Sequence, residues 1–257
     1  MKPEFTEFSY GFALTYEVAH ALQPGLVAEP LFPTLLAGQG GQAGFPARGY
    51  PIYLQFRLAE YMKTAHAREW STYGSSYFRL TIPSRLRSNR HNLLRALSAE
   101  EAEVYYAGPA FYRQLEFNQA FVSNQLLAES RLIPLRQLPD LADDQPHYLT
   151  YCRGIPGLHW HSAGGRHIRA AISGDGWLEQ LRKDAGEPRS LGSDYFLRLR
   201  RRLVQLLKEH TLQPDLFLAD LEVAEEGEDT ATLLRDLRYL LVTYFGVETL
   251  ILRPAGR

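Results

Sequence analysis

The residues of this chain that could support hydrolytic chemistry lie near its N-terminus. Glu7 stands at the beginning of a predicted helix, and Gln55 and Arg57 lie two positions apart in an alternating apolar segment. Side chains two apart in a strand share a face, so the amide and the guanidinium would point the same way. Metal-dependent cleavage at such a site requires anionic oxygen ligands for Mg²⁺. The first aspartate of the chain is Asp140, so carboxylates are scarce here.

Composition limits the class of protein. The chain has 257 residues, of which 45% are hydrophobic and 22% charged, and its net charge is −1. These values are ordinary for a globular protein with a full core, and they predict neither nucleic-acid nor membrane binding from overall charge. The single cysteine, Cys152, excludes an internal disulfide framework. The sequence shows no apolar signal segment or membrane span, so we expect a cytoplasmic protein without a membrane partner.

The first 139 residues alternate between helical and extended patterns. Thr6 can cap the first helix, and residues 51–58 show the clearest strand alternation. Helices are predicted over 6–23, 88–97 and 114–129, and strands over 29–36, 51–58, 77–82, 104–107 and 132–135, with a glycine-rich turn at 38–44. This order of elements favours an α/β fold in which helices flank a mixed β-sheet.

An acidic, proline-containing segment, residues 137–145, separates this region from the rest of the chain. We therefore expect an α/β core over residues 1–139. A mostly helical C-terminal extension over residues 140–257 would pack on it as one unit. Within the extension, strands are predicted over 147–152, 158–162 and 247–252, and helices over 176–183, 193–210 and 229–245, with Gly246 as the stop signal.

The helix with Glu7, the strands after it and the Tyr53-x-Gln55-x-Arg57 motif resemble the PD-(D/E)XK restriction-endonuclease-like superfamily over about residues 6–135. Its members surround one or two metal ions with an acid on the first helix, an aspartate on the second strand and an acid-x-lysine pair on the third. The resemblance implies that Glu7 is the helix acid, Gln55 the acid of the pair and Arg57 its lysine. The aspartate position falls near residues 42–45, which contain no carboxylate.

These departures indicate a degenerate metal site. A glutamine amide oxygen still ligates weakly, but guanidinium is broad and stays protonated where lysine offers a compact charge. We expect no metal and no cofactor, with Mg²⁺ entering only if ligands such as Glu29 or Glu60 replace the missing ones. We also predict that Glu7, Gln55 and Arg57 lie on one side of the sheet. Independently of the family, the same three residues could form a structural cluster on a half-buried face.

A basic run follows the predicted 51–58 strand, with few acids and several aromatic residues between its arginines. Such a surface can follow phosphates while aromatic rings stack on bases. We therefore predict that five arginines contact nucleic acid: Arg79, Arg85, Arg87, Arg90 and Arg95. The alternative is that residues 87–95 form an ordinary solvated helix face.

Other chemistry has weaker support. His159 and His161 would share a face of a strand, with Cys152 nearby. The remaining spacing fits no zinc pattern, so packing and hydrogen-bonding roles are favoured, and the sequence does not fix them further. The chain has no phosphate-binding loop ending in Gly-Lys-Ser/Thr and no Gly-x-Ser-x-Gly nucleophile elbow.

Three functions stay open at this point. The favoured one is a nuclease-fold protein that is not itself an enzyme and that binds DNA or RNA, or serves as a scaffold, beside protein partners in a multi-subunit assembly. The second is an active metal-dependent endonuclease with relocated ligands, and the third is a protein–protein adaptor. The aromatic-rich, arginine-heavy chain also resembles small accessory proteins of bacterial anti-phage defence and mobile-element loci.

Overall fold

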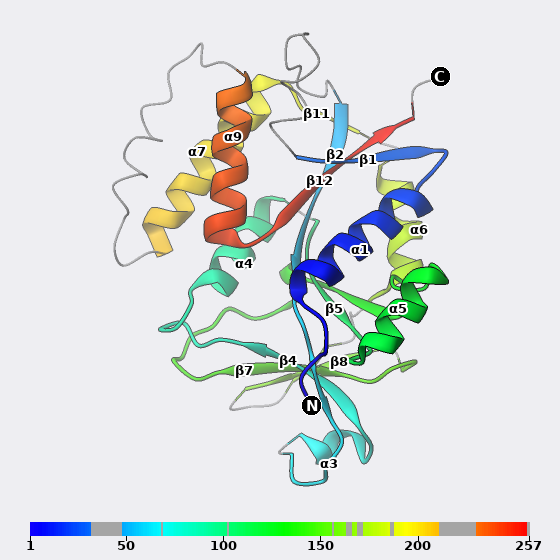
Figure 1. Ribbon diagram of the computed structural model, residues 1–257. Helices are drawn as coiled ribbons and strands as arrows, with labels where there is room; N and C mark the ends of the chain where they lie inside the picture. The colour runs from blue at the N-terminus through cyan, green and yellow to red at the C-terminus, as the bar shows by residue number, and fades with distance from the viewer. Residues whose placement is uncertain are drawn as a thin grey trace.

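The computed structural model describes residues 1–31, 48–67, 69–101, 103–155, 157–162, 166–168, 172–185, 188–210 and 230–255. They form an α/β fold in which helices cover both faces of a mixed sheet, and a second sheet lies beside it (Figure 1). The predicted class, a mixed sheet flanked by helices with helices in the C-terminal part, is confirmed. No helix among the described residues is long and apolar enough to span a membrane.

The large sheet has the strand order β1–β12–β2–β5–β6–β10, with β11 beside β2. Its strands are β1 (Leu26–Pro30), β2 (Arg48–Phe56), β5 (Val104–Pro109), β6 (Ser130–Pro134), β10 (Ile172–Ser173), β11 (Arg189–Ser190) and β12 (Glu248–Pro254). β2 and β5 run parallel, and the other neighbouring pairs are antiparallel. Parallel neighbours need a long crossover, which here contains helix α4 (Arg90–Glu100).

The small sheet is antiparallel and has the order β3–β4–β7–β8–β9. Its strands are β3 (Glu60–Met62), β4 (Tyr77–Ile82), β7 (His147–Tyr151), β8 (Leu158–His161) and β9 (Arg166–Ile168). β4 precedes Asp140 and β7 follows it, and in the large sheet β12 lies between β1 and β2. The expected extension, residues 140–257, is therefore interleaved with residues 1–139 in both sheets.

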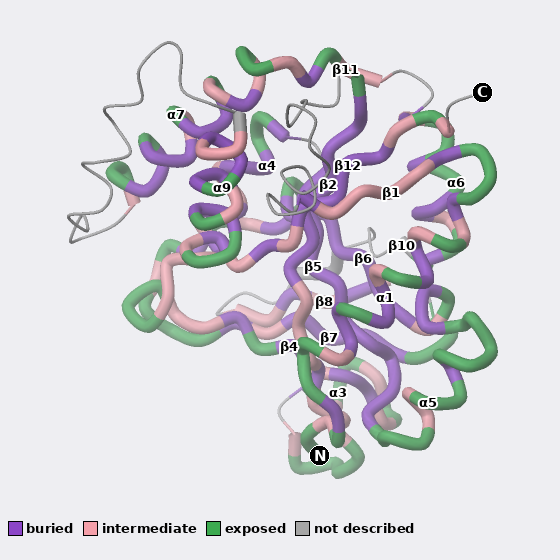
Figure 2. Tube along the Cα trace, turned by 45° about the horizontal axis from the view of Figure 1, so that its top comes forward, coloured by how far each residue is buried: buried purple, intermediate pink, exposed green. Residues whose placement is uncertain are grey.

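Alternation along β2 divides the core in two. Ile52 and Leu54 face one apolar cluster, and Tyr53 faces the other. The first is covered by α1 (Glu7–Ala21), α5 (Gln114–Val122) and α6 (Gly174–Asp184). The second is covered by α4, α7 (Ser193–His210), α9 (Thr230–Leu240) and the π-helical turn η2 (Leu241–Phe245). The central strands are buried along most of their length (Figure 2).

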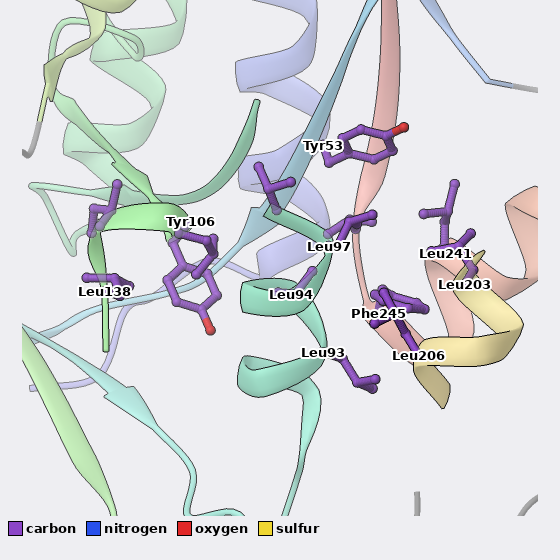
Figure 3. Close-up of a cluster of buried hydrophobic side chains, with 14 of the residues drawn as sticks. Tyr53, Leu93, Leu94, Leu97, Tyr106, Leu138, Leu203, Leu206, Leu241 and Phe245 are labelled. Atoms are coloured by element: carbon purple, nitrogen blue, oxygen red, sulfur yellow. The ribbon is translucent and has the colours of Figure 1, made fainter. Parts of the chain in front are cut away.

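Close packing fixes α4 and η2 against the sheet. Figure 3 shows leucines of α4 lying between Tyr106 of β5 and Phe245 of η2, and each of these two aromatic side chains is fully buried. Burying one large apolar side chain contributes roughly 1.5–3 kcal/mol. Two short elements complete the described part: α3 (Trp70–Tyr73) and the 3-10 turn η1 (Leu135–Gln137).

Two predicted boundaries differ from the structure for identifiable reasons. Helix α5 ends at Val122 instead of residue 129, because Asn124 adopts a left-handed φ of 53° and the Glu17 carboxylate of α1 accepts hydrogen bonds from Leu126 N and Leu127 N. The strand predicted over 29–36 overlaps β1, which spans Leu26–Pro30, only at residues 29 and 30, and residues 32–36 lie outside the described residues. The glycine-rich turn at 38–44 lies outside the described residues.

Candidate functional site

Gln55 and Arg57 lie at the end of β2 and, as predicted, on the face that carries Tyr53. The Gln55 side chain is buried, and its Nε2 donates to the Phe245 carbonyl at 3.4 Å. Its Oε1 has no hydrogen-bond partner among the described residues, and the same holds for the buried Nε of Arg57. A buried acceptor and a buried donor without partners are costly in a folded protein.

Arg90, the first residue of α4, lies near these two side chains. Its Nε donates to the Tyr244 carbonyl at 3.1 Å and its Nη2 to the Thr243 carbonyl at 3.0 Å, so the guanidinium closes the C-terminal end of η2. A Cβ placed on Gly246 would lie 2.8 Å from Arg90 Nη1 and 2.9 Å from Gln55 Nε2. The ends of the Arg90 and Gln55 side chains therefore both lie beside Gly246, and either would have to shift to admit a Cβ there.

The electrostatics of the cluster are those of two neighbouring cations. Burial lowers the pKa of Arg90, and the Arg57 guanidinium lowers it further, while Tyr106 and Glu7 act in the opposite direction. Among the described residues, neither Arg57 nor Arg90 has a carboxylate within 4 Å. Arginine stays protonated at this position, so the end of β2 has a local excess of positive charge. We call Arg57 and Arg90 the arginine pair.

Tyr106 and His91 form an uncharged, hydrogen-bonded pair next to the arginine pair. Tyr106 is fully buried, its hydroxyl lies 2.9 Å from His91 Nδ1, and His91 Nε2 lies 2.9 Å from the Pro139 carbonyl. A carbonyl only accepts, so Nε2 carries the imidazole proton and Nδ1 accepts from Tyr106. Burial lowers the pKa of His91 to about 4, and burial raises the pKa of Tyr106 although both members of the arginine pair oppose this.

Glu7 reaches the end of β2 from α1, which packs on the face opposite Gln55, and its charge still acts on Arg90. The prediction that it lies on one side of the sheet with Gln55 and Arg57 therefore stays a prediction. Helix α1 packs on Phe56, whose ring meets Tyr10 edge-on at 6.0 Å between centroids. Phe56 and Gln55 are consecutive, so they point to opposite faces of the strand. Glu7 Oε1 accepts from Leu58 N at 3.4 Å, beyond the strand's end. This geometry argues against Glu7 and Gln55 acting together as metal ligands.

The residues of this site do not fit Mg²⁺, which the superfamily resemblance implies. The donors are one neutral amide oxygen and one carboxylate from the other face, and two guanidinium groups would repel a divalent cation. Within the described ranges, no group of three or more histidine, cysteine, aspartate or glutamate residues could hold a metal ion. Residues 42–45, the expected aspartate position, fall outside those ranges.

Two of the five arginines predicted to contact nucleic acid instead form ion pairs with carboxylates of the chain itself. Arg79 lies 3.0 Å from Glu60 and 3.7 Å from Glu69, with its guanidinium 4.9 Å from the centroid of the Tyr148 ring. Arg95 lies 3.4 Å from Asp140, and its Nη1 donates to the Leu135 carbonyl at 2.9 Å. These side chains hold β3, β4 and α4 in place.

The other three arginines converge on one groove. Arg85, Arg87 and Arg90 line a hollow of about 760 Å³ at the N-terminal end of α4, together with Asn89, Asn92 and His210. Arg85 makes an exposed pair with Asp144 at 3.6 Å. Arg87 is exposed and makes no ion pair with any residue the structure describes. Glu209 also lines the groove, so its three arginines outnumber its single carboxylate and leave a net positive charge beside the arginine pair.

The histidine and cysteine candidates have structural surroundings. His161 Nε2 lies 2.7 Å from Thr150 Oγ1, and His159 meets the Tyr73 ring edge-on at 5.3 Å. The buried Cys152 thiol faces the Ser76 carbonyl at 3.7 Å, and burial raises its pKa. The packing role predicted for the histidines agrees with these contacts.

Sequence reasoning did not predict that Arg90 and Gln55 both lie beside Gly246, because the two residues are on different elements and Arg90 was interpreted as part of a helix surface. The only signal was Gly246, which was interpreted as a helix stop and also leaves space for both side chains. Comparison of the chain with protein-family models, curated proteins and solved structures gave no match.

Proposed function

We propose that this protein binds nucleic acid through its phosphate groups, at the arginine pair and the adjoining groove, and does not cleave it. In this role it serves as a nucleic-acid-binding or scaffold subunit beside partner proteins. The proposal rests on the arginine pair and does not depend on the superfamily resemblance.

The observation that carries the proposal is the proximity of two part-buried guanidinium groups without a carboxylate partner. Each cation raises the free energy of the other and has lost hydration, so an anion between or beside them is stabilising. Guanidinium groups match phosphate oxygens in geometry and form charge-assisted hydrogen bonds with them. The buried Nε of Arg57, which has no partner among the described residues, is a donor available for such a bond.

The groove favours a polymer of phosphates over a single small anion. Arg85 and Arg87 extend the positive charge outward from Arg90, and two asparagine side chains lie among them. Because the net charge of the chain is only −1, attraction to a polyanion must come from this local concentration of cations.

The binding test uses a fluorescent 20-nucleotide single strand and the matching duplex in a salt series. Arg57→Gln with Arg90→Gln should weaken binding by at least about tenfold, since each lost charge-assisted bond contributes about 1.5–3 kcal/mol. The slope of log affinity against log salt should flatten by about 0.9 for each lost duplex contact, or about 0.7 for single strand. The double variant Arg182→Gln with Lys183→Gln removes equal charge from the exposed face of α6 and should bind normally.

Arg57→Gln alone is the second arm, because it leaves the hydrogen bonds of Arg90 to η2 intact. It should lower affinity without lowering the midpoint of thermal unfolding. If wild-type protein showed no salt-dependent binding to DNA or RNA, the proposal would be contradicted. The protein–protein adaptor would then be the favoured function. An equal loss in the α6 control would assign binding to diffuse charge.

Catalysis is tested separately. With Mg²⁺ or Mn²⁺, the purified protein should leave linear, supercoiled and single-stranded DNA intact, because the site repels a divalent cation. Metal-dependent nicking that disappears in Glu7→Ala would overturn this expectation and support an active nuclease with relocated ligands.

A further inference from the structure

The helices on the far side of the large sheet expose an unusual number of large apolar side chains. Their exposed fractions lie between 39% and 82%. The set, called here the aromatic face, comprises Phe8, Phe12 and Tyr16 of α1 and Leu115, Phe121 and Val122 of α5. Single exposed apolar residues are ordinary on protein surfaces, but a set of six on two helices is not.

These side chains form one surface. Phe8, Phe12 and Tyr16 are spaced four apart, so they follow one stripe along α1. The Tyr16 and Phe121 rings lie 6.0 Å apart between centroids, which joins the stripe to α5. Both helices cover the same side of the large sheet, and both carry exposed segments along their outer sides (Figures 1 and 2).

The middle of the aromatic face carries no exposed charge, whereas Glu7, Arg113 and the partly exposed Glu116 lie at its ends. From residue 8 to residue 21 the only acidic or basic residue besides histidine is Glu17, which is 5% exposed and accepts the hydrogen bonds from the chain after α5. From residue 117 to residue 125 there is none. Enrichment in aromatic residues together with depletion of charge is the compositional mark of a protein–protein interface.

Its size is that of a dimer interface. Because a large side chain carries about 150–250 Å² of surface, the six exposed fractions amount to roughly 600–900 Å² per protomer. A stable interface buries about 800 Å² on each partner, whereas the largest apolar patch of a typical monomer is about 300–600 Å².

We propose that the aromatic face binds a second copy of this chain across a two-fold axis. A two-fold interface places a surface against itself, so a charged patch would repel its own copy and an uncharged one does not. Nucleic acid would require cations here, and an anionic membrane surface would require a basic rim. The groove at α4 lies on the other side of the large sheet, so the dimer leaves the arginine pair accessible.

The experiment is analytical ultracentrifugation of the full chain between about 1 and 100 µM. Wild-type protein should sediment as a dimer, and Phe12→Glu should weaken dimerisation by at least about 30-fold, the effect of losing a central apolar anchor. Leu86→Glu is the matched control, because Leu86 is 73% exposed and lies outside the aromatic face. It should leave the dimer unchanged, and neither substitution removes a core contact.

Charge complementation adds a second arm. Phe12→Glu mixed with Phe12→Lys should restore a dimer, because the two-fold axis brings equivalent parts of α1 near one another. A wild-type monomer at 100 µM, or a dimer that survives Phe12→Glu, would overturn the proposal. Binding of a monomeric wild type to phosphatidylcholine vesicles would also overturn it and assign the face to a membrane surface.

Discussion

Gly246 shows how one residue position controls the geometry of the site. Its φ is 67°, a left-handed value that glycine adopts readily, and a Cβ there would press on Arg90 and Gln55. Gly246→Ala should therefore destabilise the protein through both strain and steric overlap. Gly74 has a similar φ of 62° and open space around it, so Gly74→Ala isolates the strain.

Urea denaturation measures the difference. Gly74→Ala should cost about 1–2 kcal/mol, and Gly246→Ala should cost at least about 1 kcal/mol more because of the overlap. Gly246→Ala should also weaken nucleic-acid binding, since it displaces Arg90. Equal losses of stability in the two variants would show that the contacts over Gly246 are loose.

His91 makes stability depend on pH. Burial lowers its pKa from 6.5 to about 4 in the folded protein. The hydrogen bond to the Pro139 carbonyl and the charge of Asp140 oppose this, whereas Arg95 and His147 lower the pKa further. Between these values the unfolded state binds the proton and the folded state does not. Stability is therefore complete above about pH 6.5 and falls as the pH drops toward 4, by up to roughly 3 kcal/mol.

The measurement is the free energy of unfolding at pH values from 7.5 to 4.5. His91→Gln should flatten its pH dependence in this range, and His66→Gln, at an exposed position, should leave it unchanged. If wild-type protein and His91→Gln gave parallel curves, another group would be responsible for the dependence.

Of the individual residues of the site, the sequence predicted the relation between Gln55 and Arg57 but not the position of Arg90. Strand parity placed Gln55 and Arg57 on one face correctly, because alternation in a strand is a local property. The side on which Glu7 lies depends on how α1 packs against the sheet, and helix periodicity alone does not determine that. That Arg90 and Gln55 both lie beside Gly246 depends on the tertiary contact between α4 and η2, which leaves no pattern in either segment.

The elements were predicted well where patterns are long and strongly periodic, as in α1 and α7. They were predicted less well where tertiary contacts end an element. Residues 114–129 keep a helical apolar pattern, yet α5 stops at Val122 because Glu17, from another helix, captures the backbone N–H groups of Leu126 and Leu127. Because Glu17 lies more than 100 residues from Leu126 and Leu127 in the sequence, the apolar periodicity of residues 114–129 cannot predict these hydrogen bonds.

Substitutions of Arg79 in β4 and of Arg87 in the turn before α4 should affect stability and nucleic-acid binding separately. Arg79→Gln leaves the buried carboxylate of Glu69 without its cation, so it should lower stability by about 1–3 kcal/mol and leave nucleic-acid affinity unchanged. Arg87→Gln in the groove should do the reverse. Thermal unfolding and fluorescence anisotropy of both variants provide the comparison, and loss of affinity in Arg79→Gln would assign the phosphate contacts to β4.

The strand order indicates that the described residues fold as one unit. β12 separates β1 from β2, and β7 pairs with β4, so both sheets need strands from each side of residue 140. We expect a single cooperative unfolding transition for the full chain and none for a fragment of residues 1–139. Co-expressed fragments 1–139 and 140–257 should co-purify, because each supplies strands that the other lacks.

Circular dichroism and urea titration of the isolated 1–139 fragment would check this expectation. A cooperative transition in that fragment would restore the two-part division predicted from the acidic segment at 137–145. The sequence indicated the class of fold but not this interleaving, since composition marks flexible segments and does not reveal which strands pair.

The position of β12 also affects how the protein is made. β12 follows every other described strand in the chain and pairs with both β1 and β2. During translation, the edges of β1 and β2 that pair with β12 therefore stay unpaired until the last strand emerges. Exposed strand edges are where nascent chains associate wrongly, which makes this chain a candidate for chaperone protection at the ribosome. β12 pairs with β2 next to Gln55, so the proposed binding site is complete only once residues 248–254 have left the exit tunnel.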